Sequence, residues 1–355
     1  MELVYDDKSH RDLIFQMYQD IFKDPEKFAE YYFDVIYPKN QVLMAWDGVW
    51  LQGMIHLNPY RMKISDKEFD AHYIVAVATR KEMRRKGVMR KMLCRVLNDM
   101  AERGEPFTYL IPADKAYYEP FDFVFVMDWA ETEITGEAGA VTGSPEQFQG
   151  DDMQEVLRFL NRQIRSYDIY TVIDQDYIQQ AAREAKSQDG DLMVFREHGE
   201  IIGVFAYGKE KDTVYIRLGF GTDEKRFLEM ISRTFPDNKI EISAGCLKQG
   251  KKVPKIMFRI TSLEALCRCL KSRKKTEFIL TVTDPVIGKN NGTFLFSASK
   301  DGTEIRPSSK KAVEELSIGD FSKAVFGYGG EEVLERHPCL RELIPLDAVY
   351  ITEEV

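Results

Sequence analysis

The feature that most constrains the fold is a succession of four local patterns in the first third of the chain. Residues 73–78 form a continuous apolar stretch, Tyr-Ile-Val-Ala-Val-Ala, which predicts a buried strand. After Gly87, apolar residues recur at positions 88, 89, 92, 93, 96, 97 and 100, the spacing of one buried helix face. Gly104 ends this helix, and residues 107–111 predict the next strand. The order predicts a βαβ unit whose loop lies at the carboxyl end of the first strand.

This loop and the helix after it are strongly basic. Residues 80–95 hold a single acid, Glu82, and eight basic side chains, which are Arg80, Lys81, Arg84, Arg85, Lys86, Arg90, Lys91 and Arg95. A helix N-terminus offers free N–H groups and a positive dipole end, and Gly87 lets the backbone approach a phosphate closely. We therefore expect a pyrophosphate to bind here. The alternative is a solvated basic face on an amphipathic helix, above all for the last three of these residues.

Composition limits the class of protein. At 355 residues the chain is too long for one compact core. Its net charge of −9 argues against a sequence-independent nucleic-acid binder and leaves room for a cationic substrate. The sequence contains no apolar run long enough for a membrane span and no secretory signal at its start, so we expect a cytoplasmic protein. The five cysteines are scattered and have no metal-ligand spacing, so we expect free thiols and no metal.

Composition shifts divide the chain into three predicted domains, 1–140, 141–252 and 253–355. Glycine, Thr and Pro gather before residue 150, and a basic connector follows residue 247. The second domain loosely repeats the plan of the first, with a helix, a hairpin, a strand, a helix and a strand at residues 153–164, 192–207, 214–218, 224–234 and 239–242. The third reads as a small α+β domain with a strand, a capped helix and a hairpin at residues 257–260, 262–270 and 278–297.

The basic loop resembles a known family. Residues 77–90, Val-Ala-Thr-Arg-Lys-Glu-Met-Arg-Arg-Lys-Gly-Val-Met-Arg, resemble the acyl-CoA loop of the GNAT acetyltransferases, whose pattern is [Gln/Arg]-x-x-Gly-x-[Gly/Ala]. Arg84 and Gly87 match, and Met89 departs from the small third position. That departure is usual in one branch, the enhanced intracellular survival acetyltransferases. Further matches to that branch are residues 116–123, 257–260, 263–266, 278–284 and 350–355.

The resemblance implies an α/β (α+β) fold with two GNAT-like domains in tandem, the second lacking the cofactor loop, and a sterol-carrier-like α+β domain at the end. It also implies a hexamer and acetyl-CoA as co-substrate. The backbone of Val77 and Thr79, with Ala78 between them, would pair with the pantetheine arm. Ala113 and Asp114 would line the far side of the cofactor. The loop would hold the pyrophosphate through Arg84, Arg85, Lys86, Gly87, Val88, Met89 and Arg90.

The resemblance also implies the catalytic groups. Tyr118 matches the general acid, and the terminal α-carboxylate, here that of Val355, matches the general base; the family usually ends in an aromatic residue. Acetyl transfer to an amine needs a base to take the amine proton and an acid to protonate the departing thiolate. A tyrosine, with an ordinary pKa of about 10, keeps its proton at neutral pH. The alternative for Tyr118 is a packed core side chain, and the alternative for Val355 is a frayed chain end. His72 is a rival candidate for the base.

The acceptor is inferred from the family's cleft walls. Phe28 and Tyr32 lie where the family's first helices line the substrate cleft, and Glu354 is next to the terminal carboxylate. Aromatic and acidic groups suit a polycationic amine, such as an aminoglycoside or a polyamine; helix core is the alternative for the aromatics. We therefore expect N-acetylation of such a small molecule. Two alternatives stay open: acetylation of a protein amine, and a CoA- or lipid-binding module with vestigial catalysis.

Overall fold

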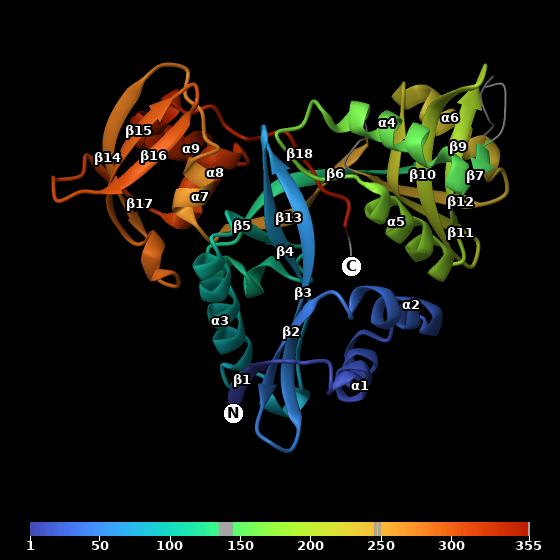
Figure 1. Cartoon of the computed structure of the whole chain (residues 1–355), viewed down its shortest axis with the longest axis horizontal. Coiled ribbons are helices and arrows are strands. Elements are labelled where there is room, and N and C mark those ends of the chain that lie inside the picture. Colours follow the sequence, from blue (N-terminus) through green and yellow to red (C-terminus); the bar gives the residue numbers. More distant parts are fainter. Residues whose placement is uncertain (135–144, 245–246, 248–249, 354–355) are drawn as a thin grey trace.

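The computed structural model describes residues 1–134, 145–244, 247 and 250–353. Figure 1 shows three lobes: the first unit with the N-terminus, a second unit in green and yellow, and a C-terminal unit in orange and red. None of the described helices is long and apolar enough to span a membrane. The four described cysteines are free thiols, which agrees with the expectation for them: Cys94, Cys267, Cys269 and Cys339.

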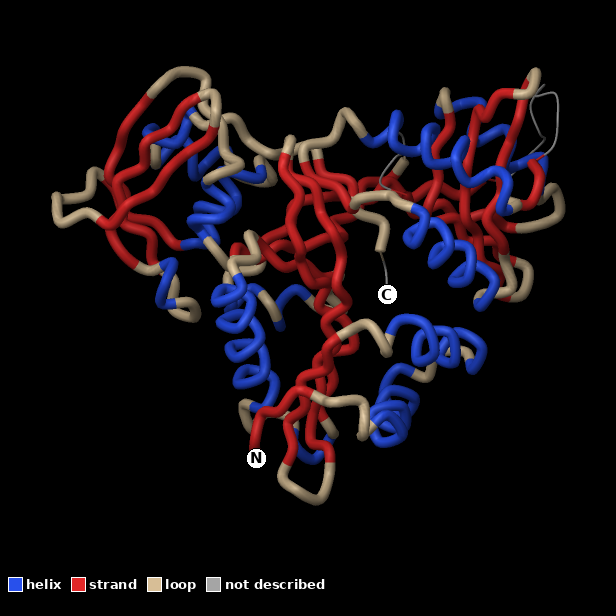
Figure 2. Tube along the Cα trace, in the orientation of Figure 1, coloured by secondary structure: helices blue, strands red, loops and turns tan. Residues whose placement is uncertain are grey.

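The first unit is a strongly twisted sheet with helices on both sides. Figure 2 shows α1 and α2 on one side of its strands and α3 on the other. Its elements are β1 (Glu2–Tyr5), α1 (Arg11–Phe22), α2 (Glu26–Tyr31), β2 (Gln41–Trp46), β3 (Leu51–Ile64), β4 (Lys67–Thr79), α3 (Val88–Arg103) and β5 (Phe107–Leu110). The predicted βαβ unit is confirmed, because β4 and β5 are parallel and α3 buries the expected stripe from Val88 to Met100. Gly104, at φ 75°, ends α3.

The second unit repeats the element order of the first. It contains β7 (Pro145–Gln147), α4 (Met153–Ile164), β8 (Ile169–Thr171), α5 (Gln175–Ser187), β9 (Asp191–Glu197), β10 (Glu200–Glu210), β11 (Thr213–Gly221), α6 (Glu224–Thr234) and β12 (Lys239–Ala244). Two helices, three antiparallel strands, a helix and a parallel strand follow each other in both units. The hairpin predicted at residues 192–207 is confirmed, and its turn between β9 and β10 lies at His198 and Gly199, both at positive φ. This shared order supports an internal duplication.

The two units share one fourteen-stranded sheet. Its path runs β1-β2-β3-β4-β5-β13-β6-β12-β11-β10-β9-β7, so β6 (Val124–Ile134) and β13 (Lys251–Ile260) join the halves. The predicted boundary at residue 253 assigned residues 257–260 to the third domain, and the structure corrects this. β13 lies between β5 and β6, where Phe258 stacks on Phe107 with ring centroids 4.3 Å apart. The boundary predicted at residue 140 lies outside the described residues.

The C-terminal unit has a separate four-stranded sheet in the order β16-β15-β14-β17. Its elements are α7 (Leu263–Cys267), β14 (Thr276–Thr283), β15 (Gly292–Ser299), β16 (Gly302–Pro307), β17 (Glu314–Ser317), α8 (Ile318–Phe326) and α9 (Glu331–Arg336). Ser262 caps α7 by accepting a hydrogen bond from the Ala265 N–H, as its sequence predicts. Phe326 of α8 packs edge-on against Phe258 of β13, which joins this unit to the shared sheet.

A buried ion pair lies at the same junction. The side chains of Arg259 and Asp284 are fully buried, and their Nη2 and Oδ1 atoms are 2.6 Å apart. Arg259 Nε also donates to the Phe121 carbonyl at 2.6 Å. Asp284 accepts further hydrogen bonds from the N–H groups of Val286 and Ile287. The pair therefore connects β13, the turn that contains Phe121 and the C-terminal unit.

The last described segment returns to the centre of the molecule. β18 (Val349–Tyr350) pairs in parallel with β8, and β8 pairs with β3 of the first unit. Trp129 Nε1 donates to the Ile351 carbonyl at 3.2 Å, and the Tyr350 ring lies 4.7 Å from that of Phe220. In Figure 1 this red segment runs down beside β3 toward α5. The tail is therefore held between the first and second units.

The buried pair gives a test of how the units are joined. Asp284→Asn keeps the side-chain size and leaves the Arg259 charge buried without its counter-ion, so we expect the free energy of unfolding to fall by about 3–5 kcal/mol. Urea unfolding followed by circular dichroism measures it. The control is Glu304→Gln in the pair Glu304–Arg306, whose side chains are 72% and 76% exposed; it should change stability by less than about 0.5 kcal/mol. Equal stability of both variants would contradict the inferred role of the pair.

Candidate active site

The strands β4 and β5 pair at one position and then separate. Tyr73 and Tyr109 form the only registered pair between these two strands in the described chain, with rings stacked 5.1 Å apart. β4 continues to Thr79 while β5 ends at Leu110. On its other side β4 stays paired with β3 as far as Thr79. Among the described residues no strand therefore covers the β5-facing edge of β4 beyond Tyr73. An extended ligand that carries amide groups can pair with such an edge.

A bulge interrupts β4 at this edge. The register with β3 shifts between the pairs Met54–Ala78 and His56–Val75, and Ala76 between them has a left-handed φ of 49°. A non-glycine residue in this conformation is strained, and such strain is frequent at functional sites. The bulge turns the strand, so that Val77 and Thr79 are half-buried on the way to the basic loop.

The basic loop ends in a concave stretch of backbone. Arg85 and Gly87 have φ values of 61° and 79°, which turns successive N–H groups toward one side. α3 begins directly afterwards at Val88, and no side chain caps its N-terminus. Gly87 and the side chains of Arg84, Arg85, Lys86 and Arg90 are exposed, Met89 is half-buried and Val88 is buried. The N–H groups, the helix dipole and these cations together make a site for a phosphate-bearing ligand.

Not all of the predicted basic cluster serves this loop. Arg80 Nε donates to the Leu51 carbonyl at 2.7 Å, and Arg95 Nε donates to Asp99 at 2.7 Å. Arg84 folds back, with Nε 3.2 Å from the Thr79 carbonyl oxygen. Arg80 and Arg95 are thus explained by the packing of the chain, while the exposed cations on either side of Gly87 are free to face an anion.

In the second unit, the helix that corresponds to α3 is α6, and a carboxylate lies at its N-terminus. Asp223 stands at the N-terminus of α6 and accepts a hydrogen bond from the Arg226 N–H at 2.9 Å. A carboxylate at this point satisfies the N–H groups and the helix dipole that a phosphate would otherwise use. The second unit therefore has no counterpart of the basic loop at the start of α6.

Tyr118 lies just after β5, between two short turns of 3₁₀ helix, Lys115–Tyr117 and Glu119–Phe121. Its ring is 7% exposed and packs edge-on against Phe123. Its hydroxyl makes no hydrogen bond within the described part of the chain. Burial, with a smaller effect from Tyr117, raises the pKa of Tyr118 to about 12. The hydroxyl therefore stays protonated at neutral pH and is suited to donate a proton.

The residues around Tyr118 hold its loop in place. Asp114 is exposed, and its side chain accepts a hydrogen bond from the Ala116 N–H at 2.9 Å, while Ala113 beside it is exposed. The Tyr118 carbonyl accepts from the Phe121 N–H at 2.9 Å. Arg259 binds the carbonyl of that same Phe121. The buried ion pair described above therefore also fixes the turn that carries Tyr118.

His72, the rival base, belongs to a buried cluster. Its Nδ1 atom lies 3.0 Å from the Glu105 carboxylate, and Arg103 donates to the same carboxylate at 2.6 Å. His72 is 7% exposed and Glu105 is 4% exposed. This arrangement accounts for the histidine as a partnered residue of the strand.

A cleft of about 670 Å³ separates α1 and α2 from the second unit. Phe28 lines this cleft, and Val75 and Ala76 bring β4 into its wall. Tyr32 does not line it, which corrects the expectation for this residue. Its side chain is fully buried, and its hydroxyl contacts His56 Nδ1 at 3.1 Å and Asn58 Oδ1 at 3.0 Å. Tyr32 belongs to the core of the helical layer.

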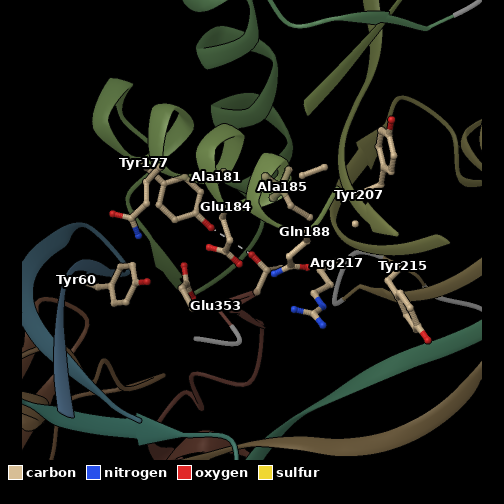
Figure 3. A pocket seen from close by; sticks show the side chains of 15 residues that line it. Tyr60, Tyr177, Ala181, Glu184, Ala185, Gln188, Tyr207, Tyr215, Arg217 and Glu353 are labelled. Atoms are coloured by element: carbon tan, nitrogen blue, oxygen red, sulfur yellow. Dashed lines mark hydrogen bonds between the residues drawn. The ribbon is translucent and has the colours of Figure 1, made fainter. Parts of the chain in front are cut away.

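A smaller chamber of about 60 Å³ adjoins the cleft, and sequence reasoning missed it. Figure 3 shows Tyr60, Tyr177, Glu184 and Glu353 around it. These residues come from β3, α5 and the tail, so only the folded chain brings them together. The chamber shares wall residues with the cleft, namely Gln188, Gly208, Tyr215 and Arg217. Glu354 and Val355, the two predicted site residues after Glu353, lie outside the described residues.

One acidic group outside the cleft has its ligand atoms within 4.8 Å of one another: Asp6, Asp7 and His10. Their atoms already have protein partners. Asp6 accepts from Tyr37 and lies 3.1 Å from His10 Nδ1, while Asp7 accepts from the Ser9 N–H at 3.0 Å. These contacts account for the cluster without an ion.

Comparison with known proteins agrees with this geometry. Residues 6–126 match the acetyltransferase (GNAT) domain, and residues 262–338 match the sterol carrier protein domain. The protein is an enzyme with a GNAT acetyltransferase domain. The GNAT domain spans α1, α2, the separating strands and the basic loop, and GNAT domains use acetyl-CoA as co-substrate. No curated protein sequence matches the chain.

Solved structures with GNAT domains share the fold over the whole chain. A probable N-acyltransferase from Enterococcus faecalis has a TM-score of 0.80 at 15% identity, over 97% of this chain and 93% of that chain. A GCN5-related N-acetyltransferase from Anabaena variabilis has a TM-score of 0.75 at 14% identity, over 99% of this chain and 97% of that chain. Eis1 from Mycobacterium abscessus has a TM-score of 0.70 at 12% identity, over 100% of this chain and 99% of that chain. At sequence identities of 12–15%, these structures show a similarity in fold alone.

The basic loop of the GNAT domain yields a direct prediction. Gly87→Glu puts an anion where the backbone is arranged for a phosphate, and it strains a left-handed residue, so we expect at least a tenfold weaker affinity for CoA, about 1.4 kcal/mol. Isothermal titration calorimetry measures it. Gly199→Glu is the matched control, since Gly199 has φ 84°, likewise nothing within 4 Å of an added Cβ, and lies in a distant hairpin. Equal CoA affinity in the two variants would refute the phosphate site.

Proposed function

We propose that the protein transfers the acetyl group of acetyl-CoA to a primary amine of a polycationic small molecule, aminoglycoside-like or polyamine-like, by direct attack. The observation that carries this proposal is the course of β4. Val75 and Ala76 lie in the wall of the large cleft, and the strand ends at Thr79 beside the phosphate-binding loop. A donor on the free edge of β4 would therefore meet an acceptor that enters from the cleft.

The charge of the acceptor side supports a cationic substrate. Three cationic side chains line the cleft and the chamber together, Lys27, Lys209 and Arg217. Six carboxylates line the same walls: Asp24, Glu26, Glu184, Asp189, Glu210 and Glu353. An excess of one sign in a cleft raises the local concentration of ligands of the opposite sign.

We assign the cofactor contacts along β4 and its loop. The backbone groups of Val77 and Thr79, on either side of Ala78, would pair with the amides of pantetheine. Residues 84–90 would hold the pyrophosphate through the N–H groups of the concave backbone and the cations beside Gly87. Ala113 and Asp114, both exposed at the start of the Tyr118 loop, would line the far side of the cofactor.

The proposed chemistry is one displacement at the thioester carbonyl. The neutral amine attacks the carbonyl carbon, the new C–N bond forms, and the C–S bond breaks. The base takes the proton that the amine nitrogen loses, and Tyr118 gives its hydroxyl proton to the leaving thiolate. We assign the base to the terminal α-carboxylate of Val355, with Glu354 beside it as an acceptor contact. The described tail supports this route, because Thr352 and Glu353 already line the chamber.

From the resemblance to the enhanced intracellular survival branch, we also propose that the protein is cytoplasmic and forms a hexamer.

Two other functions use the same features: acetylation of a lysine or N-terminal amine of a protein, and CoA or lipid binding with vestigial catalysis. A thiol-release assay with acetyl-CoA and a panel of aminoglycosides, polyamines and peptides separates the three. Turnover with the small amines supports our proposal, turnover with peptides alone supports the protein acceptor, and tight CoA binding without any turnover supports the binding module.

Tyr118→Phe tests the proton donor. Removal of a general acid typically costs about 10²–10⁴ in rate, so we expect kcat to fall within that range while KM for acetyl-CoA stays within about twofold. Because the pKa of Tyr118 is about 12, its deprotonation should not reduce kcat of the unmodified enzyme below about pH 11. Tyr117→Phe is the control, as Tyr117 is adjacent and 57% exposed. Similar kcat values for both variants would remove Tyr118 from the mechanism.

Deletion of Val355 tests the proposed base. It shifts the terminal carboxylate by one residue, about 3.3 Å of extended chain, so we expect at least a hundredfold loss of kcat. Val355→Ala keeps a carboxylate at the same backbone position and should keep most of the activity. Steady-state acetylation assays compare the two. If the deletion variant is fully active, the role of base passes to His72 or to a water molecule.

A further inference from the structure

The wall of the chamber beside the cleft includes a buried carboxylate, that of Glu353, without a hydrogen-bond partner among the described residues. Glu353 is 7% exposed, and neither of its side-chain oxygens makes a hydrogen bond of normal geometry with the described residues. Burial raises the pKa of the Glu353 carboxyl, and the smaller effects of its own backbone N–H and of the Thr171 and Tyr177 hydroxyls act in the opposite direction. A buried carboxylate of this kind is costly unless something pairs with it.

The other buried acids of the described chain show the contrast. Asp284 is paired with Arg259 and accepts from two backbone N–H groups. Glu105 is shared by His72 and Arg103. Asp191 accepts from the Leu192 N–H at 2.9 Å. Among these four acids, Glu353 alone has no hydrogen-bond partner for either oxygen within the described residues, and it lines the chamber. An ammonium group that enters the chamber would give this carboxylate a partner of opposite charge.

The chamber has the size and walls of a site for an ammonium group. Its volume of about 60 Å³ exceeds the roughly 10–15 Å³ that one water needs, so an ammonium group and the methylene that carries it can enter. Tyr60 and Tyr177 line it with aromatic rings, which attract cations by their faces. Its charged wall residues are two carboxylates, Glu184 and Glu353, and one guanidinium, that of Arg217. The balance favours a cation.

The chamber lies within reach of an acceptor in the cleft. The two spaces share four wall residues, and Tyr60 in the chamber wall has its ring 6.4 Å from that of Tyr109. Tyr109 forms the pair with Tyr73 at which β4 and β5 separate. The tail that presents Glu353 is fixed by the pairing of β18 with β8 and by the Trp129 bond to Ile351. Glu353 is thus held beside the point where donor and acceptor would meet.

We propose that this chamber is a subsite for a second, non-reacting ammonium group of the acceptor, with Glu353 as the side chain that binds it. The inference rests on the proposed function and deepens it, because it assigns a place in the structure to a second amine of the polycationic acceptor. Glu353 then determines specificity, while proton transfer is left to other groups.

The test compares acceptors that differ by one amine, 1,3-diaminopropane against propylamine and cadaverine against pentylamine. Glu353→Gln removes the charge and keeps the size. We expect KM for the diamines to rise at least tenfold, as for the loss of a hydrogen bond to a charged group, with kcat within about threefold. KM for the monoamines should stay within twofold. Glu353→Asp keeps the charge and should restore part of the affinity. Glu304→Gln, in the exposed pair of the C-terminal unit, is the control.

Two results would overturn the proposal. An equal loss for monoamines and diamines would mean that Glu353 acts in the chemistry or in folding, and unchanged KM values for the diamines would mean that the chamber binds no ammonium group. If the enzyme acetylates no amine, the proposed function fails, and binding decides the inference separately. Calorimetric titration of the CoA-bound protein with spermidine should then show binding that Glu353→Gln weakens at least tenfold, and no binding to the unmodified protein would refute the subsite.

Discussion

The arrangement of this enzyme depends on one buried guanidinium. Arg259 sits on β13, the strand that joins the two halves of the large sheet, and it is neutralised by Asp284 from the C-terminal unit. Its Nε holds the Phe121 carbonyl, three residues after the proposed proton donor. Charged groups removed from water are tolerated only with complete hydrogen bonding, so this pair allows little relative movement of the parts that it joins. The C-terminal unit therefore supports the loop that carries Tyr118.

Local patterns in the sequence predicted the parts of the fold that depend on local interactions. The stripe from Val88 to Met100, the left-handed Gly104 and the turn at His198 and Gly199 are each fixed by neighbours in the chain, and the structure confirms them. The left-handed backbone at Gly87 follows from the same local rules. The parallel pairing of β4 and β5 was also predictable, because a helix must connect two such strands.

Features that depend on distant pairing were not predictable. The apolar stretch at the end of β13 fits any buried strand, and only the pairing with β5 and β6 shows that it belongs to the large sheet. Tyr32 and Phe28 are both aromatic residues of the same helical segment, yet one is enclosed by His56 and Asn58 and the other faces the cleft. The sequence contains no signal for the chamber, whose walls come from β3, α5, β10, β11 and the tail.

The position of β18 has a consequence for how the enzyme is made. Synthesis proceeds from the N-terminus, so the strands and loop of the GNAT domain emerge long before residues 349–353, which pair with β8 and complete the chamber. A nascent chain can thus form the paired strands and the basic loop while the chamber still lacks the wall that the tail provides. A chain that ends before residue 349 would lack both the pairing of β18 with β8 and the wall residues Thr352 and Glu353.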